Sequence, residues 1–138
     1  MGQLMPRVID DYVRHVEGKP IIAIEAEAAI VDAPDRASFW FVKFYVEGYR
    51  LSLKTDEDTD EIIISIEPTD NAPSIVPRNS ALVSLVGRTF GWLWRASNSQ
   101  GYQDMAIIGF GGEGMGVTPQ VAFLVEASAI HLHRLALV

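Results

Sequence analysis

The distribution of apolar residues predicts one helix followed by a series of strands. Apolar side chains recur at three- and four-residue steps from Leu4 to Val16, as on one face of an amphipathic helix, and Gly18 and Pro20 end that pattern. From residue 21 to residue 31 apolar and polar residues alternate instead, which is typical of a half-buried strand. The chain is therefore expected to open with an amphipathic helix and a strand.

The rest of the chain continues as strand patterns separated by turns. Seven further segments carry such patterns, at residues 39–46, 49–54, 61–67, 90–96, 102–110, 120–127 and 130–138. Three prolines between residues 68 and 79 predict a long surface connection, and a short helical turn capped by Asn79 or Ser80 is expected after it. Strands do not alternate with helices, which favours an antiparallel sheet. We predict an α+β fold, mostly antiparallel β, with a curved sheet or two-layer β arrangement, one N-terminal helix and a single domain over residues 1–138.

A long hairpin at residues 87–110 holds two of the three tryptophans. In its first arm Phe90, Trp92 and Trp94 alternate with Gly91 and Leu93, and a spacing of two predicts that the three rings share one face of the strand. Residues 97–101 supply the turn, with a glycine where a positive φ is expected. The rest of the chain is expected to be organised around this hairpin.

Composition and charge exclude several classes of protein. The chain has 138 residues, of which 49% are hydrophobic and 21% charged, so a disordered chain is excluded and no apolar run is long enough to span a bilayer. It contains no cysteine, which removes disulfides and thiolate-ligated metals. A net charge of −7 argues against nucleic-acid binding and favours a basic protein partner. The first residues have no apolar signal region, so cytoplasmic residence is expected.

One stretch of the hairpin also carries a family resemblance. The run GRTFGWLWRASNSQGYQD at residues 87–104, with DTDEI at Asp58–Ile62 upstream, resembles a family of small uncharacterised bacterial proteins known mainly as a domain of unknown function. The resemblance spans roughly Phe44 to the C-terminus and leaves the helix Pro6–Val16 outside. It implies a bacterial protein with this fold. Because that family has no established activity, no catalytic residue is carried over.

Two spacings imitate ligand-binding motifs. Gly109–Gly114 matches G-x-G-x-x-G, but no helix is expected to begin there to receive a pyrophosphate, so we predict a hairpin loop. Asp56, Asp58, Asp60 and Glu67 have the oxygen-ligand spacing of a calcium loop, but the position that needs glycine holds a glutamate and a strand follows. We therefore predict a solvated acidic turn, and no cofactor.

Metal and catalytic sites have little support elsewhere in the chain. His131 and His133 would project from one face of the last strand, and Asp104 or Glu126 could add a third ligand only if the sheet brings it across. We favour half-exposed strand positions for both histidines, with no metal. No serine lies in a nucleophile elbow, so no catalytic residue is assigned.

The aromatic and polar side chains of the hairpin are the candidate binding residues. They are Trp92, Trp94, Arg95, Asn98, Tyr102 and Asp104. In one interpretation the rings are core, Asn98 shapes the turn, and Asp104 bonds a backbone group or Arg95. In the other they form a recognition surface, because tryptophan, tyrosine and arginine are enriched in binding hot spots.

These observations favour a binding protein over an enzyme. We expect a non-enzymatic protein-binding or regulatory module, of the kind that neutralises another protein, with a basic partner. The alternative is a small-ligand-binding protein or enzyme with a pocket in the curved sheet, using Tyr102, Asp104, His131 or His133. The apolar last strand also predicts a homodimer through a sheet face or edge.

Overall fold

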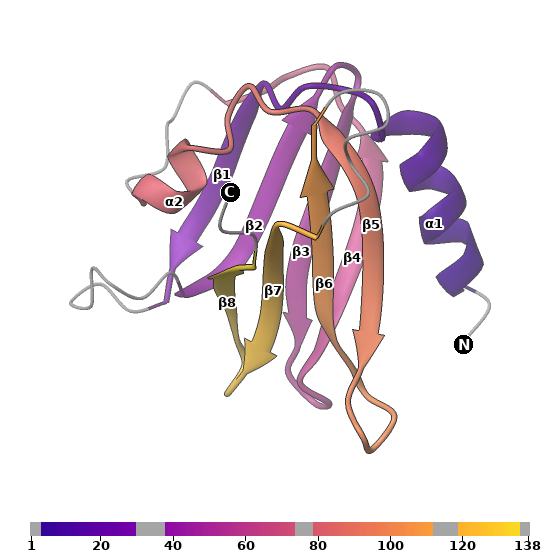
Figure 1. Ribbon diagram of the computed structural model, residues 1–138, viewed down its shortest axis with the longest axis vertical. Coiled ribbons are helices and arrows are strands. Elements are labelled where there is room, and N and C mark those ends of the chain that lie inside the picture. The colour runs from indigo at the N-terminus through magenta and orange to yellow at the C-terminus, as the bar shows by residue number, and fades with distance from the viewer. Residues whose placement is uncertain (1–3, 30–37, 74–78, 112–118, 136–138) are drawn as a thin grey trace.

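The computed structural model describes residues 4–29, 38–73, 79–111 and 119–135, with side chains from residue 8 onward. Its elements follow the predicted order closely (Figure 1). They are α1 (Leu4–His15), β1 (Ala23–Ala28), β2 (Ser38–Val46), β3 (Tyr49–Asp56), β4 (Glu61–Pro68), α2 (Ser80–Val83), β5 (Phe90–Ser97), β6 (Gln103–Phe110), β7 (Val121–Glu126) and β8 (Ala129–Arg134).

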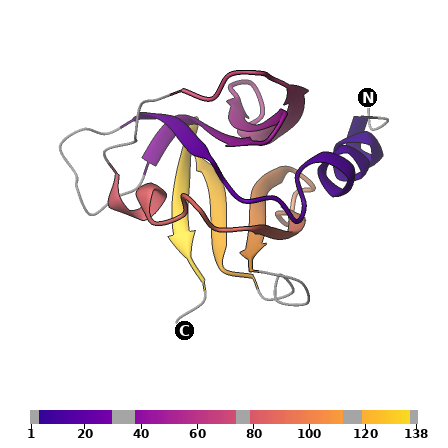
Figure 2. The ribbon, with the colours of Figure 1, turned by 90° about the horizontal axis from the view of Figure 1, so that it is seen from above.

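The strands form one antiparallel sheet that curls into a half-barrel. Along the sheet the order is β4-β3-β2-β8-β7-β6-β5, and β1 pairs with the other edge of β2. Strands β1–β4 make one wall and β5–β8 make the other, as the view from above shows (Figure 2). The start of β2 pairs with β8 at one corner, and the segment before β1 bridges to the start of β5 through Pro20 and Thr89 at the other. The predicted α+β class with a curved antiparallel sheet and an N-terminal helix is confirmed.

The core lies between the two walls and centres on Phe44. Its ring meets Phe90 at 5.6 Å and Phe123 at 5.8 Å between centroids, both edge to face. Phe44 comes from the first wall and the other two rings from the second, and none of the three is more than 1% exposed. Aromatic pairs in this geometry add to the stabilisation from apolar burial. The two walls are thus joined by side chains far apart in the sequence.

Helix α1 packs across the open side of the half-barrel, beside β4 and β5 (Figure 1). Tyr12 and Val16 are buried, and the Tyr12 hydroxyl donates a 2.7 Å hydrogen bond to the Gly91 carbonyl. Burial, with the nearby charge of Glu17, raises the pKa of Tyr12 far above its usual range. His15 stacks on Tyr49 with 4.0 Å between ring centroids. Tyr12 and Val16 of the predicted apolar stripe thus close the barrel, whereas Ile9 and Val13 of the same stripe are exposed.

Helix α2 is the predicted short helical turn. The Asn79 side chain caps it by accepting a hydrogen bond of 3.1 Å from the Leu82 backbone N–H. Leu82 and Leu85 are buried, so this turn covers part of the core. The predicted helical turn, with Asn79 as its cap, is confirmed.

A β-bulge in β5 changes the expected direction of its aromatic side chains. Phe90 lies opposite Phe110 and Leu93 opposite Ile108, so β5 has one extra residue between these pairs. Phe90 is 1% exposed, whereas Trp92 is 51% exposed. The prediction that Phe90, Trp92 and Trp94 share one face is wrong, because the extra residue reverses the alternation after Phe90.

A second bulge, in β2, changes the direction of the Trp40 side chain. Glu27 lies opposite Phe41, whereas Ala28 lies opposite Phe39, so Trp40 is the extra residue. Phe39 is buried and Trp40 is 46% exposed. Both irregularities therefore bring a tryptophan to the outer surface, one on each wall.

Candidate functional site

The outer face of β5–β7 is mainly apolar, and β8 adds two histidines to it. Residues directly opposite each other in neighbouring strands share a face. One row of such residues is Trp94, Ile107, Ala122 and His133, and the next is Ala96, Met105, Leu124 and His131. The outer face of an antiparallel sheet is commonly polar, because it meets water. We call these two rows, together with Trp92, the apolar outer face.

Trp92 and Trp94 form the most prominent part of this face. Their ring centroids are 5.8 Å apart with 55° between the ring planes, so the indoles pack against each other. Trp92 is 51% exposed and Tyr102, beyond the turn, is 43% exposed. Exposed tryptophan and tyrosine side chains supply large contact areas with little loss of conformational freedom.

The turn that carries Tyr102 is held by Asn98. Its side-chain oxygen accepts hydrogen bonds from the Gln100 N–H at 2.9 Å and the Tyr102 N–H at 3.2 Å. Its side-chain nitrogen donates to Asp104 at 3.3 Å, and Gly101 has a φ of 90°. The prediction that Asn98 shapes the turn is confirmed, as is the positive φ at the glycine.

Arg95 faces the other side of β5. It lies opposite Ala106, which is fully buried, and its side chain is half-buried. Burial lowers the pKa of Arg95, and the negative charge of Glu61 partly opposes this effect. The structure therefore separates Arg95 from the two tryptophans, and the six predicted binding residues do not form one cluster.

The histidines of β8 lie on the apolar outer face. His131 Nδ1 is 2.9 Å from the Ser38 hydroxyl, and His131 Nε2 is 3.4 Å from the Glu126 carbonyl oxygen. His133 is exposed. Within the described residues no group of three or more His, Asp or Glu side chains is placed to hold a metal ion.

The acidic turn after β3 serves a structural role. Asp60 accepts hydrogen bonds from the Ser128 N–H at 3.1 Å and from the Ser128 hydroxyl at 3.3 Å. Glu67, the twelfth position of the calcium-like spacing, lies near the far end of β4 and forms an ion pair with Arg50 at 3.0 Å. The four carboxylates thus do not converge. The G-x-G-x-x-G loop lies largely outside the described residues.

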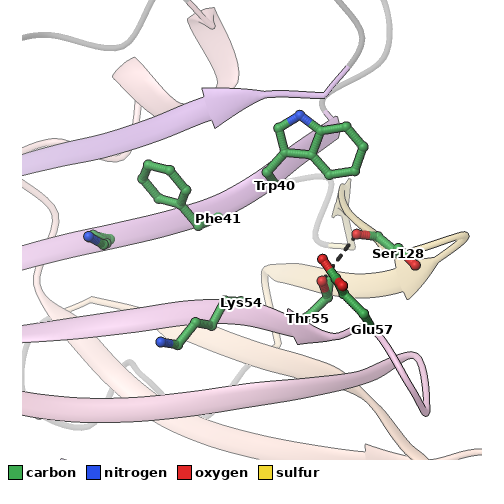
Figure 3. A pocket seen from close by; sticks show the side chains of 7 residues that line it. Trp40, Phe41, Lys54, Thr55, Glu57 and Ser128 are labelled. Atoms are coloured by element: carbon green, nitrogen blue, oxygen red, sulfur yellow. Dashed lines mark hydrogen bonds between the residues drawn. The ribbon is translucent and has the colours of Figure 1, made fainter.

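A hollow that the sequence did not predict lies on the outer surface of the other wall. It encloses about 370 Å³ and is lined by Trp40, Phe41, Lys43, Lys54, Thr55, Glu57 and Ser128. Figure 3 shows Trp40 beside the group of Thr55, Glu57 and Ser128, with Phe41 and Lys54 further along the neighbouring strands. The residues expected to line a pocket, Tyr102, Asp104, His131 and His133, are not part of it.

Strained backbone lies at one end of this hollow. Ala127 and Ser128, the two residues between β7 and β8, have φ values of 51° and 66°, and Asp60 has 55°. This left-handed conformation costs a residue other than glycine roughly 1–2 kcal/mol. The Asp60–Ser128 bonds and a 3.1 Å bond from the Thr55 hydroxyl to the Ser128 carbonyl hold the turn in place. Positive φ at both residues is what a two-residue hairpin loop between β7 and β8 requires.

These features define a small α+β protein, a curled antiparallel half-barrel with an apolar face on one wall and a hollow on the other. The chain belongs to a family of unknown function, DUF6334, whose model matches residues 5–138. The match includes helix α1, so the expectation that this helix lies outside the family is wrong. Comparisons with curated proteins and with solved structures give no match. Among the helices described here, none is long and apolar enough to cross a membrane.

Proposed function

We propose that this protein is a non-enzymatic protein-binding module, of a regulatory or immunity type, and that its docking surface is the apolar outer face. The observation that carries the proposal is the placement of Trp92 and Trp94. The bulge in β5 turns both rings away from a core that Phe90 and Leu93 already fill from the same strand. A packed indole pair on a sheet face with few charges is the kind of anchor that dominates binding energy in protein interfaces.

The partner that fits this surface is a basic protein. The chain carries a net charge of −7, and Glu126, two residues beyond Leu124 in β7, borders the apolar outer face. An acidic surface speeds the encounter with a basic partner, while the desolvated aromatic centre slows dissociation. Residence in the cytoplasm, where such a partner would be met, remains a prediction.

The three tryptophans allow a matched test. Wild-type protein, a Trp92→Ala/Trp94→Ala double variant and a Trp40→Ala control are immobilised and exposed to extract of the organism that makes the chain. Trp40 is a suitable control because it is 46% exposed but lies on the other wall. We expect a protein that wild type and Trp40→Ala retain equally and that the double variant retains at least about tenfold less, since hot-spot residues typically contribute about 2 kcal/mol or more.

Salt provides a second readout in the same experiment. Retention of a basic partner is expected to fall as the salt concentration rises, because screening weakens attraction between the two charged surfaces. Equal retention by all three proteins would contradict the proposed surface. Retention that depends on the tryptophans but not on salt would contradict the basic character of the partner.

A small-ligand-binding function is the second candidate. The hollow of about 370 Å³ favours it, because that volume lies within the range of small-molecule sites. It lies on the wall opposite the tryptophan pair, so the two functions do not compete for one surface.

A further inference from the structure

The hollow at Trp40 is lined by two lysine side chains, Lys43 and Lys54, and by the aromatic ring of Phe41 as well as that of Trp40. Phe41 and Lys54 lie directly opposite each other in β2 and β3, and Lys43 follows Phe41 by two residues on the same face. The two lysines are therefore diagonal neighbours, within reach of one bound group. The Lys43 Nζ atom lies 4.9 Å from the centroid of the Phe41 ring.

Among the described residues neither lysine forms an ion pair with a carboxylate. In the part of the chain that the structure describes, the one ion pair joins Arg50 to Glu67, outside this hollow. Two carboxylates lie near the lysines: Glu57 also lines the hollow, and Glu25 lies opposite Lys43 in β1.

The Trp40 ring provides a flat apolar surface in the same hollow as the two lysines. The bulge in β2 is what brings its ring to the surface, and bulges are frequent next to binding sites, where they redirect a side chain. The ring is 46% exposed although a residue of this size is usually more deeply buried. A planar ligand ring could cover it.

One end of the hollow is closed by the turn that contains Ser128. Ser128 is held in a left-handed conformation by Asp60 and Thr55, which come from the turn after β3 and from β3 itself. Residues far apart in the chain thus maintain a strained turn against the hollow. The positive φ values at Ala127 and Ser128 are those that a two-residue hairpin between β7 and β8 requires, so the turn itself accounts for them.

We propose that the hollow binds a small anion that carries a planar ring. The ring lies against Trp40 and Phe41, and the anionic group lies between Lys43 and Lys54. A mononucleotide and an aromatic carboxylate share this chemistry, and the hollow has room for either. The site is separate from the apolar outer face and does not depend on the protein-binding function.

The test follows the three indole N–H signals of the full-length protein by NMR during titration. Probes are adenosine 5′-monophosphate and indole-3-acetate, with adenosine and inorganic phosphate as half-ligands. We expect one ring-bearing anion to shift the Trp40 signal and to leave Trp92 and Trp94 unchanged, with a dissociation constant at least about tenfold lower than that of either half-ligand. The probe that binds more tightly tells a nucleotide from a carboxylate.

Variants of the hollow complete the test. Lys54→Ala, followed by the Trp40 signal, is expected to weaken binding by about fivefold or more, and Lys54→Arg to retain most of it. Trp40→Ala lacks that signal, so its binding is measured by calorimetry, and a loss of about fivefold or more is expected. Lys19→Ala is the matched control, because Lys19 also lies over an aromatic ring, that of Tyr49 at 5.3 Å, but outside the hollow. Lys54 and Trp40 are exposed, and circular dichroism checks that both variants fold.

Three results would overturn the proposal. They are a titration in which neither ring-bearing anion shifts the Trp40 signal, binding of inorganic phosphate as tight as that of the ring-bearing anions, and binding that Lys54→Ala and Trp40→Ala leave unchanged. None of them bears on the apolar outer face.

Discussion

Replacement of Tyr12 by phenylalanine tests how α1 closes the half-barrel. The substitution removes only the hydroxyl, which donates to the Gly91 carbonyl at 2.7 Å in a site where Tyr12 is 1% exposed. The carbonyl is then left without that donor at the bulge of β5. An unsatisfied buried polar group costs about 1–3 kcal/mol, so we expect Tyr12→Phe to lower the free energy of unfolding by about 1–2 kcal/mol at about pH 8.

The same substitution has a pH dependence of known sign. Burial raises the pKa of Tyr12 in the folded protein far above its ordinary value of about 10, which the unfolded chain retains. Above that pH the unfolded wild-type chain loses a proton that the folded protein keeps, so Tyr12 lowers stability by about 1.4 kcal/mol for each further pH unit. The phenylalanine variant lacks this effect. The difference between the two proteins should therefore fall close to zero at about pH 11.

Urea unfolding followed by tryptophan emission measures both quantities. All other side chains are the same in wild type and variant, so their contributions cancel in the difference. Tyr102→Phe serves as the control, because its side chain is 43% exposed, and we expect it to change stability at neither pH. A Tyr12→Phe difference that is the same at both pH values would refute the argument that burial keeps this hydroxyl protonated.

Two further predictions concern the turn at the hollow and the state of assembly. Asp60→Ala should lower the free energy of unfolding by about 1–2 kcal/mol, because Ser128 loses two hydrogen bonds that hold its backbone at positive φ. Asp58→Ala is the control and should leave the free energy of unfolding unchanged. Equal effects of the two substitutions in urea unfolding would show that Asp60 has no special role. The apolar outer face also predicts a homodimer in the absence of a partner. Light scattering should give twice the mass of the chain for wild type and for Ile63→Glu on the other wall, but a monomer for Ile107→Glu; a monomeric wild type would rule out self-association.

Local patterns were sufficient for the existence and order of the elements but not for all of their ends, since β1 is shorter than the predicted strand at residues 21–31. Strand alternation and helix spacing depend only on neighbouring residues, so the helix α1 and the strand segments could be placed from the sequence. The cap at Asn79 and the turn at Asn98 were also predictable, because each side chain bonds backbone atoms within four residues of itself. The antiparallel class followed from the absence of strand–helix–strand alternation.

The directions of the tryptophans could not be obtained in this way. Alternation predicted that Phe90, Trp92 and Trp94 share a face, but a bulge depends on the register of the partner strand, which local sequence does not reveal. The same holds for Trp40, whose exposure results from the pairing of β2 with β1. Whether these rings belong to core or surface was therefore decided by strand pairing.

The sequence by itself thus determined which segments are strands, where the chain turns, and that the protein is acidic and lacks cysteine. Only the tertiary structure decided which side chains meet. The hollow joins Trp40, Lys54 and Ser128 from three parts of the chain, and the core joins the two walls through Phe44. These contacts arise because the sheet curls until its two halves face each other, and the closure depends on pairing between residues that are distant in sequence.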